Sequence, residues 1–222
     1  MRLRNAIIGA TATLAIGVGA IDAMAAPSGA SCHGQPATYV GTDGADRFRD
    51  GEVDFGEDPV IVLRGGDDRV VLGSAAASGD VTVCGDGGDD YIGADKGSGG
   101  DSFTLDGGAG SDRIGNDSDV DRPNMGPMKL FGAAGEDTMI GADLADRLIG
   151  GSGDDLMLAV KGDDKLIGGP GEDSLFAHSG DDRSFGGDGD DRIESGGGDD
   201  FADGGADEDT CKGVERAEDC EA

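Results

Sequence analysis

Apolar residues recur every nine positions in the C-terminal half of the chain, between stretches rich in glycine and acidic residues. Written in nines from residue 132, a unit has six polar or glycine-rich residues and then a short apolar segment, as in GGSGDDLML (150–158). A strand places alternate residues on opposite faces, so the eighth residue should point inward and the seventh and ninth outward. The eighth positions hold Met139, Leu148, Met157, Leu166, Leu175, Ser184, Ile193, Ala202 and Cys211.

Aspartate fills the sixth position of every unit, and glycine fills the fourth position everywhere except at Leu144 and Asp207. A fixed period of this length is typical of a repeat fold. Each unit should form one turn and one strand, and two units should make a coil of 18 residues. We therefore predict an all-β fold for residues 132–210, a right-handed parallel β-roll (a β-solenoid) stapled by disulfides. The sixth positions are Asp137, Asp146, Asp155, Asp164, Asp173, Asp182, Asp191, Asp200 and Asp209.

Residues 26–131 carry an irregular version of the same pattern. GGAGSDRIG (107–115) is a full match that contains Asp112, and shorter matches place Asp46, Asp68, Asp90 and Asp101 at separations of 22, 22 and 11. Apolar runs at 60–63, 70–72 and 81–84 read as strands, and residues 116–131 read as an interruption. We predict an irregular β-solenoid here, with longer turns and a poorer metal geometry than in the regular array.

The composition points to export and to cations. Residues 1–25 have a basic start, an apolar stretch and an A-x-A site at 23–25, which is typical of a signal peptide, and no membrane span is expected after its removal. The chain has a net charge of −30 and no tryptophan, so a conventional core and nucleic-acid binding are both disfavoured. We expect a secreted, extracellular protein that attracts cations.

The four cysteines, Cys32, Cys84, Cys211 and Cys220, fit an exported chain. An even number of cysteines indicates disulfides, and four allow three pairings. Proximity favours Cys211–Cys220, which would close residues 211–222 into a C-terminal cap and leave Cys32 for Cys84. A zinc site is the alternative, although the sequence has no C-x₂-C pair and no histidine cluster.

Glycine-rich turns with regularly spaced carboxylates suit calcium, which takes roughly six to eight oxygen ligands in a tolerant geometry. GGSGDDLML and GGAGSDRIG match G-G-x-G-x-D-x-U-x, so the chain resembles the haemolysin-type (RTX) calcium-binding repeat family. The flanks at 31–38 and 209–221 resemble small secreted calcium-binding repeat proteins of actinobacteria. The resemblance implies several Ca²⁺ ions between successive turns of a parallel β-roll, whose ligands would come from Asp112, the nine sixth-position aspartates, Gly150, Gly153, Gly168, Gly171, Gly186 and Gly189.

The two sides of the predicted roll differ at their first positions. One side begins its units with glycine throughout, whereas the other begins with Gly141, Ala159, Ala177 and Ser195. We therefore expect tighter calcium sites on the glycine side. Calcium should also drive folding, because repulsion among the carboxylates opposes a compact state without metal.

Two further hypotheses remain beside calcium binding. The ninth positions are apolar in six successive units (140, 149, 158, 167, 176 and 185), which predicts either shielding by neighbouring strands or an outer stripe for a protein partner or self-association. An adhesion or matrix scaffold stiffened by calcium is thus the alternative function. An enzyme is not expected, because His33 and His178 are the only histidines and no catalytic motif is present.

Overall fold

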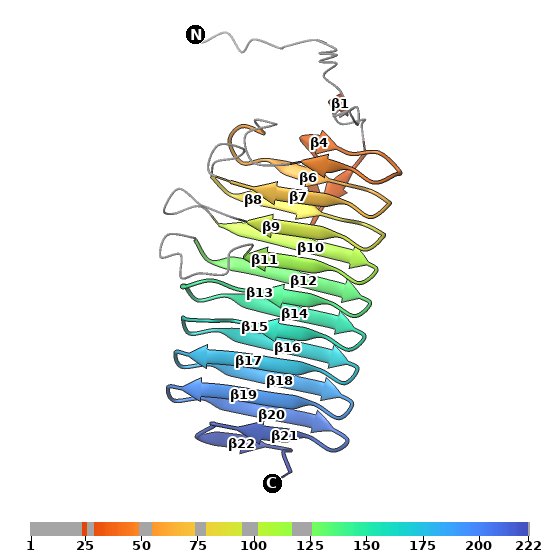
Figure 1. Cartoon of the computed structure of the whole chain (residues 1–222). Helices are drawn as coiled ribbons and strands as arrows, with labels where there is room; N and C mark the ends of the chain where they lie inside the picture. Colours follow the sequence, from red (N-terminus) through yellow and green to blue (C-terminus); the bar gives the residue numbers. More distant parts are fainter. Residues whose placement is uncertain are drawn as a thin grey trace.

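The computed structural model describes residues 24–25, 29–48, 55–73, 79–94, 102–116 and 126–221. The chain winds into a rod made of two parallel sheets that face each other, with consecutive strands alternating between them (Figure 1). The predicted parallel β-solenoid is therefore confirmed. The predicted signal peptide, apart from residues 24–25, and Asp101 lie outside the described residues.

Sheet 1 contains eleven strands and sheet 2 contains nine. Sheet 1 consists of β1 (Met24–Ala25), β4 (Tyr39–Val40), β6 (Val60–Val62), β8 (Val81–Cys84), β10 (Phe103–Ala109), β12 (Met128–Ala134), β14 (Arg147–Ser152), β16 (Lys165–Pro170), β18 (Arg183–Asp188), β20 (Phe201–Ala206) and β22 (Arg216–Glu218). Sheet 2 consists of β5 (Arg47–Phe48), β7 (Arg69–Leu72), β9 (Tyr91–Ala94), β11 (Arg113–Asn116), β13 (Thr138–Ile140), β15 (Leu156–Leu158), β17 (Ser174–Ser179), β19 (Arg192–Gly197) and β21 (Thr210–Lys212). A separate hairpin joins β2 (Ser31–Cys32) to β3 (Gln35–Pro36).

The length of a coil changes along the rod. In the irregular part, Arg47 pairs with Arg69 and Arg69 with Tyr91, a step of 22 residues. In the regular array, Arg147 pairs with Lys165, a step of 18. The coil between them is 25 residues long, since Arg113 pairs with Thr138. The strands of both parts nevertheless pair in one continuous pair of sheets.

The core is a narrow strip of side chains between the two sheets. The eighth-position side chains are buried, as predicted, except that Cys211 is only partly buried. The apolar ones belong to one hydrophobic cluster that extends from Phe48 to Ala202, while Cys32, Val60, Val62 and Cys84 form a second, smaller cluster. Two buried hydroxyls, Ser184 Oγ and Ser195 Oγ, interrupt this apolar core. Neither has a hydrogen-bond partner among the described residues.

The strands are longer than the sequence predicted. The expected strands covered positions seven to nine, but β14, β16 and β18 continue through position three of the next unit. The pairing register nevertheless skips position one, for Ile167 pairs with Phe185 and Gly169 with Gly187. The extension is possible because glycine at positions one and two lets the backbones of successive coils approach closely.

Positive φ angles occur at two places in each turn of the regular array except the turn at 141–146, where neither Ala142 nor Leu144 adopts one. The fourth-position glycines adopt them as expected, and so does the exception Asp207. Position two needs the same conformation, which the sequence did not reveal, because Ala133, Val160 and His178 stand there with φ angles of 80°, 87° and 75°. Such angles are strained for residues with a side chain, so these three positions store local strain.

Both disulfides have the predicted partners. Cys32 and Cys84 are bonded with a Cα–Cα distance of 5.9 Å, which ties the β2–β3 hairpin to the end of β8. Cys211 and Cys220 are bonded across 5.7 Å and close a loop at the C-terminal end of the rod. Both cysteines of each pair are used, so no free thiol remains.

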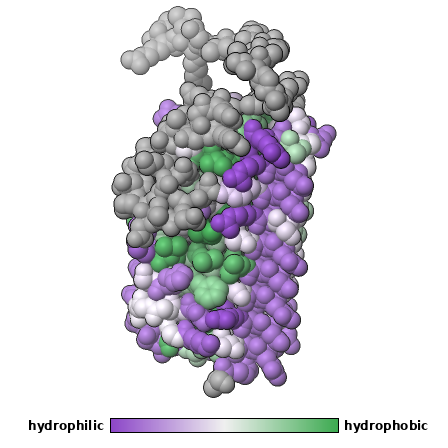
Figure 2. All heavy atoms as spheres, in the orientation of Figure 1, coloured by the Kyte–Doolittle hydropathy of each residue, from purple (hydrophilic) through white to green (hydrophobic). Residues whose placement is uncertain are grey.

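The ninth positions face outward and are half-buried. Ile140, Leu158 and Phe176 follow one another on sheet 2, while Ile149, Ile167 and Phe185 do so on sheet 1. Figure 2 shows hydrophobic side chains gathered at mid-height on one face, beside a hydrophilic column. No helix among the described residues is long and apolar enough to cross a membrane.

Candidate metal sites

The turns between the two sheets stack their sixth-position aspartates into two columns. The first column runs along the turns that lead from sheet 1 to sheet 2, and the second along the turns that lead back. All of these aspartates are buried, although each lies beside an exposed turn. The first column is Asp46, Asp68, Asp90, Asp112, Asp137, Asp155, Asp173, Asp191 and Asp209, and the second is Asp146, Asp164, Asp182 and Asp200.

Hydrogen bonds link each column from coil to coil. The backbone N–H of Asp155 donates to Oδ1 of Asp173 at 2.8 Å, and the N–H of Asp173 donates to Oδ1 of Asp191 at 2.8 Å. The second column repeats the contact between Asp146, Asp164 and Asp182. One carboxylate oxygen of each linked aspartate thus serves as an acceptor in the ladder, which explains why a side chain as short as aspartate recurs there.

The other carboxylate oxygen is left without a donor. Oδ2 is buried and has no hydrogen-bond partner among the described residues at eleven of the column aspartates, whereas Asp46 and Asp146 differ because a backbone N–H reaches their Oδ2 atoms. An unpaired buried carboxylate oxygen is unfavourable unless a proton or a cation neutralises it. The eleven are Asp68, Asp90, Asp112, Asp137, Asp155, Asp164, Asp173, Asp182, Asp191, Asp200 and Asp209.

The pKa values of these carboxyls are raised because the carboxylates are buried and lack donors at Oδ2. Burial is the main cause that raises the pKa of Asp155 to about 7 and that of Asp164 to about 8, and the charges of neighbouring aspartates contribute to both shifts. The hydrogen bond from the preceding aspartate N–H opposes the shift but does not cancel it. Without metal, Asp155 and Asp164 therefore hold protons over part of the neutral pH range, and a divalent cation could take the protons' place.

Glycine at position one makes room for the unpaired oxygen, because glycine has no Cβ. A methyl group placed on Gly168 would lie 2.1 Å from Asp173 Oδ2 and 2.6 Å from the carbonyl oxygen of Gly186 in the next coil. Gly150 and Gly186 have equivalent neighbours at 2.1 to 2.8 Å. All of these distances are too short for a methyl group, so the carboxylate oxygen can take this position only beside glycine. The groups that meet here are a carboxylate and backbone carbonyls, and this all-oxygen donor set fits a hard cation such as Ca²⁺.

In the second column, side chains occupy this space. Ala159, Ala177 and Ser195 replace the position-one glycine and are fully buried. Only Gly141 lacks a side chain there, and its neighbour Asp146 already accepts a hydrogen bond at Oδ2 from the Ala142 N–H at 2.6 Å. The difference between the two sides that the sequence indicated is thus a difference in free space around Oδ2.

The irregular part repeats the first-column arrangement. A methyl group on Gly85 would lie 2.0 Å from Asp90 Oδ2 and 2.2 Å from the Gly107 carbonyl oxygen, and one on Gly107 would lie 2.1 Å from Asp112 Oδ2. The contact between the position-one glycine and the carboxylate is therefore as close in these two turns as in the regular array. That the upstream turns have a poorer metal geometry stays a prediction.

The fourth-position glycines lie elsewhere in the turn. The carbonyl oxygen of Gly153 faces position four of the next coil, 2.2 Å from where a methyl group on Gly171 would be. Likewise, the carbonyl oxygen of Gly171 lies 2.2 Å from where a methyl group on Gly189 would be. These carbonyls stack along the rod at position four, and they do not lie beside the position-one glycines. That Gly153, Gly171 and Gly189 bind metal stays a prediction.

The two histidines have other partners. His33 Nε2 lies 3.0 Å from Asp106 Oδ2, and its ring packs on Phe131 with the ring centres 4.8 Å apart. His33 also lies near Cys32 and Cys84, but the disulfide leaves these sulfurs without a thiolate, so the zinc alternative finds no support. His178 is exposed and stacks beside Phe176 on β17.

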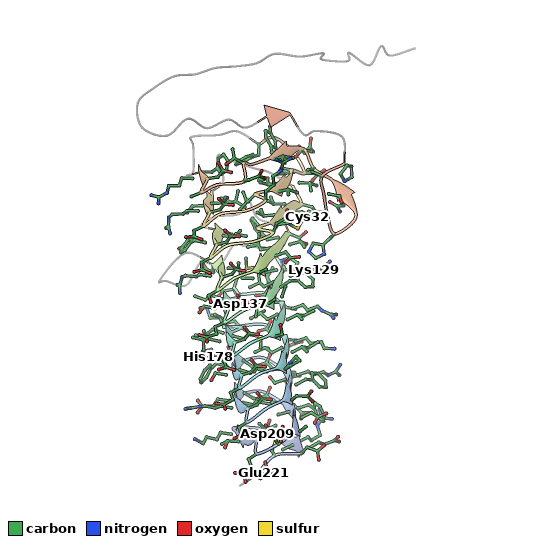
Figure 3. All side chains as sticks on the ribbon, turned by 90° about the vertical axis from the view of Figure 1, so that its right-hand side faces the viewer. Cys32, Lys129, Asp137, His178, Asp209 and Glu221 are labelled. Carbon is green, nitrogen blue, oxygen red and sulfur yellow. A yellow bond between two sulfur atoms is a disulfide. The ribbon has the colours of Figure 1, made fainter. Side chains whose placement is uncertain are left out.

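Two glutamates at the C-terminal end extend the columns, and the sequence analysis missed both. Asp200 N–H donates to Glu215 Oε2 at 2.8 Å, and Asp209 N–H donates to Glu221 Oε2 at 2.6 Å. Figure 3 shows Asp137, Asp209 and Glu221 following one another down the rod, with Glu221 at its end. Neither glutamate belongs to a nine-residue unit, so periodicity could not find them. Their closeness to Cys220 was the available signal.

Comparison with known proteins agrees with this geometry. A family profile described as RTX calcium-binding nonapeptide repeat matches four overlapping copies at residues 131–164, 149–184, 158–193 and 176–211. A search of curated proteins finds no match to the chain. The matched residues span β12 to β21, which include most of both aspartate columns. Residues 131–211 are therefore RTX calcium-binding nonapeptide repeats of the haemolysin type.

Proposed function

We propose that this chain is a secreted, non-enzymatic calcium-binding protein whose β-roll becomes fully stable only when Ca²⁺ fills the first aspartate column. The RTX repeats bind calcium as a family property. In this chain the two columns have different roles. In the first column a position-one glycine makes room for each unpaired oxygen except that of Asp68, where Leu63 stands at position one, and the second column mainly provides hydrogen-bonded structure.

The observation that carries the proposal is the buried, unpaired Oδ2 beside a position-one glycine, repeated in successive coils. Asp155, Asp173 and Asp191 each combine this oxygen with a glycine carbonyl of the next coil. In the absence of cations, stacked carboxylates about 5 Å apart repel one another, and protonation is the only other way to relieve them. Bound ions would therefore stabilise the folded state relative to the unfolded one.

Secretion is part of the proposal. The features of residues 1–25 support a cleaved signal peptide, and the two disulfides suit an oxidising compartment. Extracellular calcium modules typically bind with dissociation constants of about 10⁻⁴–10⁻³ M, and a similar value is expected here. N-terminal sequencing of protein exported from its source cell would test this point, since a chain retained inside with residue 1 intact would contradict it.

Calcium titration of the purified, disulfide-bonded protein tests the central claim. Isothermal calorimetry should detect several ions, and circular dichroism should show a gain of β-structure with CaCl₂ that a chelator reverses. Magnesium at the same concentration serves as the control, since Mg²⁺ demands a smaller and more regular oxygen shell. An absence of binding heat at millimolar calcium would refute the proposal.

A calcium-stiffened scaffold with a protein partner is the second candidate function. The outer face of sheet 2 favours it, because Ile140, Leu158 and Phe176 align there and Leu156 is 37% exposed beside them. A partner or a second copy of the chain would cover this face. Sedimentation in calcium over a wide protein concentration would separate the two cases. A constant monomer mass for both the native protein and a Leu156→Ser variant would count against self-association.

A further inference from the structure

The segment after the last repeat folds into a cap that imitates one more coil. Residues 211–221, called the cap here, contain β21, β22 and the Cys211–Cys220 disulfide. β22 pairs in parallel with β20, as the next strand of sheet 1 would do, with Ala202 opposite Ala217. The cap contains no Gly-x-Asp turn, so its resemblance to a coil arises from its geometry alone.

Glu221 takes the place of the next aspartate in the first column. Its Oε2 accepts a hydrogen bond from Asp209 N–H at 2.6 Å, as Asp209 Oδ1 does from Asp191 N–H at 2.9 Å. Its own N–H donates to the Asp209 carbonyl oxygen at 2.7 Å. In the repeats this last bond comes from the residue after the aspartate, such as Thr210, whose N–H donates to the Asp191 carbonyl oxygen at 2.8 Å. One residue thus reproduces two contacts of a repeat.

Asp219 supplies the carbonyl oxygen that a next-coil glycine would provide. A methyl group on Gly204 would lie 2.4 Å from Asp209 Oδ2 and 2.1 Å from the Asp219 carbonyl oxygen. The corresponding distances at Gly186 are 2.1 Å to Asp191 Oδ2 and 2.4 Å to the Gly204 carbonyl oxygen. Asp209 is fully buried, and its Oδ2 has no hydrogen-bond partner among the described residues.

From these contacts we infer that the cap completes one additional calcium site, formed by the Asp209 carboxylate, the Asp219 carbonyl oxygen and the Glu221 carboxylate beside Gly204. This site rests on the proposed calcium function but lies beyond the repeat pattern. The Cys211–Cys220 disulfide holds its ligands, because Cys220 stands directly between Asp219 and Glu221. The last coil would otherwise expose an unpaired buried carboxylate at the end of the rod.

Glu221→Gln tests the site, because glutamine keeps an oxygen that can accept the Asp209 N–H bond but removes the charge. Calorimetric titration with CaCl₂ should show one ion fewer than the native protein. Glu218→Gln is the matched control, since Glu218 is an exposed cap residue whose carboxylate has no part in the column. Equal stoichiometry in the Glu221→Gln, Glu218→Gln and native proteins would overturn the inference. If the native protein binds no calcium at all, the proposed function fails with it.

Hydrogen exchange in the native protein provides a second test that needs no variant. Calcium should slow exchange at the amides of Asp209 and Glu221 along with those of the central coils. Protection of the central coils with unchanged exchange at these two amides would overturn the inference. This measurement also decides the matter if Glu221→Gln impairs folding of the cap.

Discussion

Replacing Gly168 with alanine should remove one calcium site. The added methyl group would lie 2.1 Å from Asp173 Oδ2 and 2.6 Å from the Gly186 carbonyl oxygen, whereas ordinary contact begins at 3.4 Å. The carboxylate oxygen would have to retreat by about 1.3 Å, the difference between 3.4 and 2.1 Å, which is about half a calcium–oxygen bond. Gly168 does not have a left-handed φ, so its torsion angles suit alanine, but the Gly186 carbonyl must also move.

The expected magnitude follows from the lost ion. With a dissociation constant of about 10⁻⁴–10⁻³ M, one ion in 10 mM calcium stabilises the folded state by about 1.4 to 2.7 kcal/mol. Urea unfolding in 10 mM CaCl₂ and in chelator should therefore show that the calcium-dependent part of the unfolding free energy falls by that amount in Gly168→Ala. Calorimetry should show one ion fewer than in the native protein.

Gly197→Ala is the matched control for this experiment. Gly197 lies in the same array, has no left-handed φ, and has no atom within 4 Å of the added methyl group. Its substitution should leave calcium stoichiometry and calcium-dependent stability unchanged. The reasoning would be refuted if Gly168→Ala kept the full stoichiometry and the full stabilisation by calcium, because the space beside Gly168 would then have no role in binding.

Three other predictions test the columns and the core. Asp155→Asn should weaken calcium binding more than Asp164→Asn. The reason is that position one beside Asp155 is Gly150, whereas beside Asp164 it is Ala159, whose side chain fills this place. Calorimetry that showed the reverse order would contradict the assignment. Ser184→Ala should raise the unfolding free energy by about 1 kcal/mol in urea titration, because it removes a buried hydroxyl without a partner among the described residues, and an unchanged midpoint would argue against that. The metal-free protein should lose stability as pH rises from about 4 to 8. The folded-state pKa values of Asp155 and Asp164, about 7 and about 8, exceed the ordinary 3.8, so the folded state holds more protons than the unfolded state across this window. A melting temperature in chelator that increased with pH would refute this prediction.

Much of the fold followed from periodicity. A nine-residue repeat with one apolar position predicts a two-sheet roll, and the burial of Met157 and Leu166 agrees with it. The disulfide partners also followed, since proximity favoured Cys211 with Cys220. The length of the strands did not follow. Glycine-rich segments read as turns, but parallel pairing at Gly169 and Gly187 extends the strands because close stacking of coils supplies backbone partners that propensity does not describe.

The candidate sites were predicted only in part. The sequence identified the aspartates and the difference between the glycine side and the alanine side. It did not reveal that position one faces the unpaired Oδ2, since that depends on how one coil stacks on the next. It also missed Glu221, because a residue outside the repeat carries no periodic signal. Contacts between coils, which periodicity only implies, decide which oxygens meet.

The ladder explains why metal, repeat and cap depend on one another. Each column aspartate after Asp46 uses Oδ1 to accept a hydrogen bond from the coil before it, so successive coils are held in register by buried acids. The remaining oxygen makes that register unfavourable unless a cation or a proton accompanies it. A repeat with neutral side chains would avoid the penalty but would lose the dependence on calcium. The end of the column then needs an acceptor for the Asp209 N–H, and Glu221 provides it while adding the carboxylate that keeps the last site like the others.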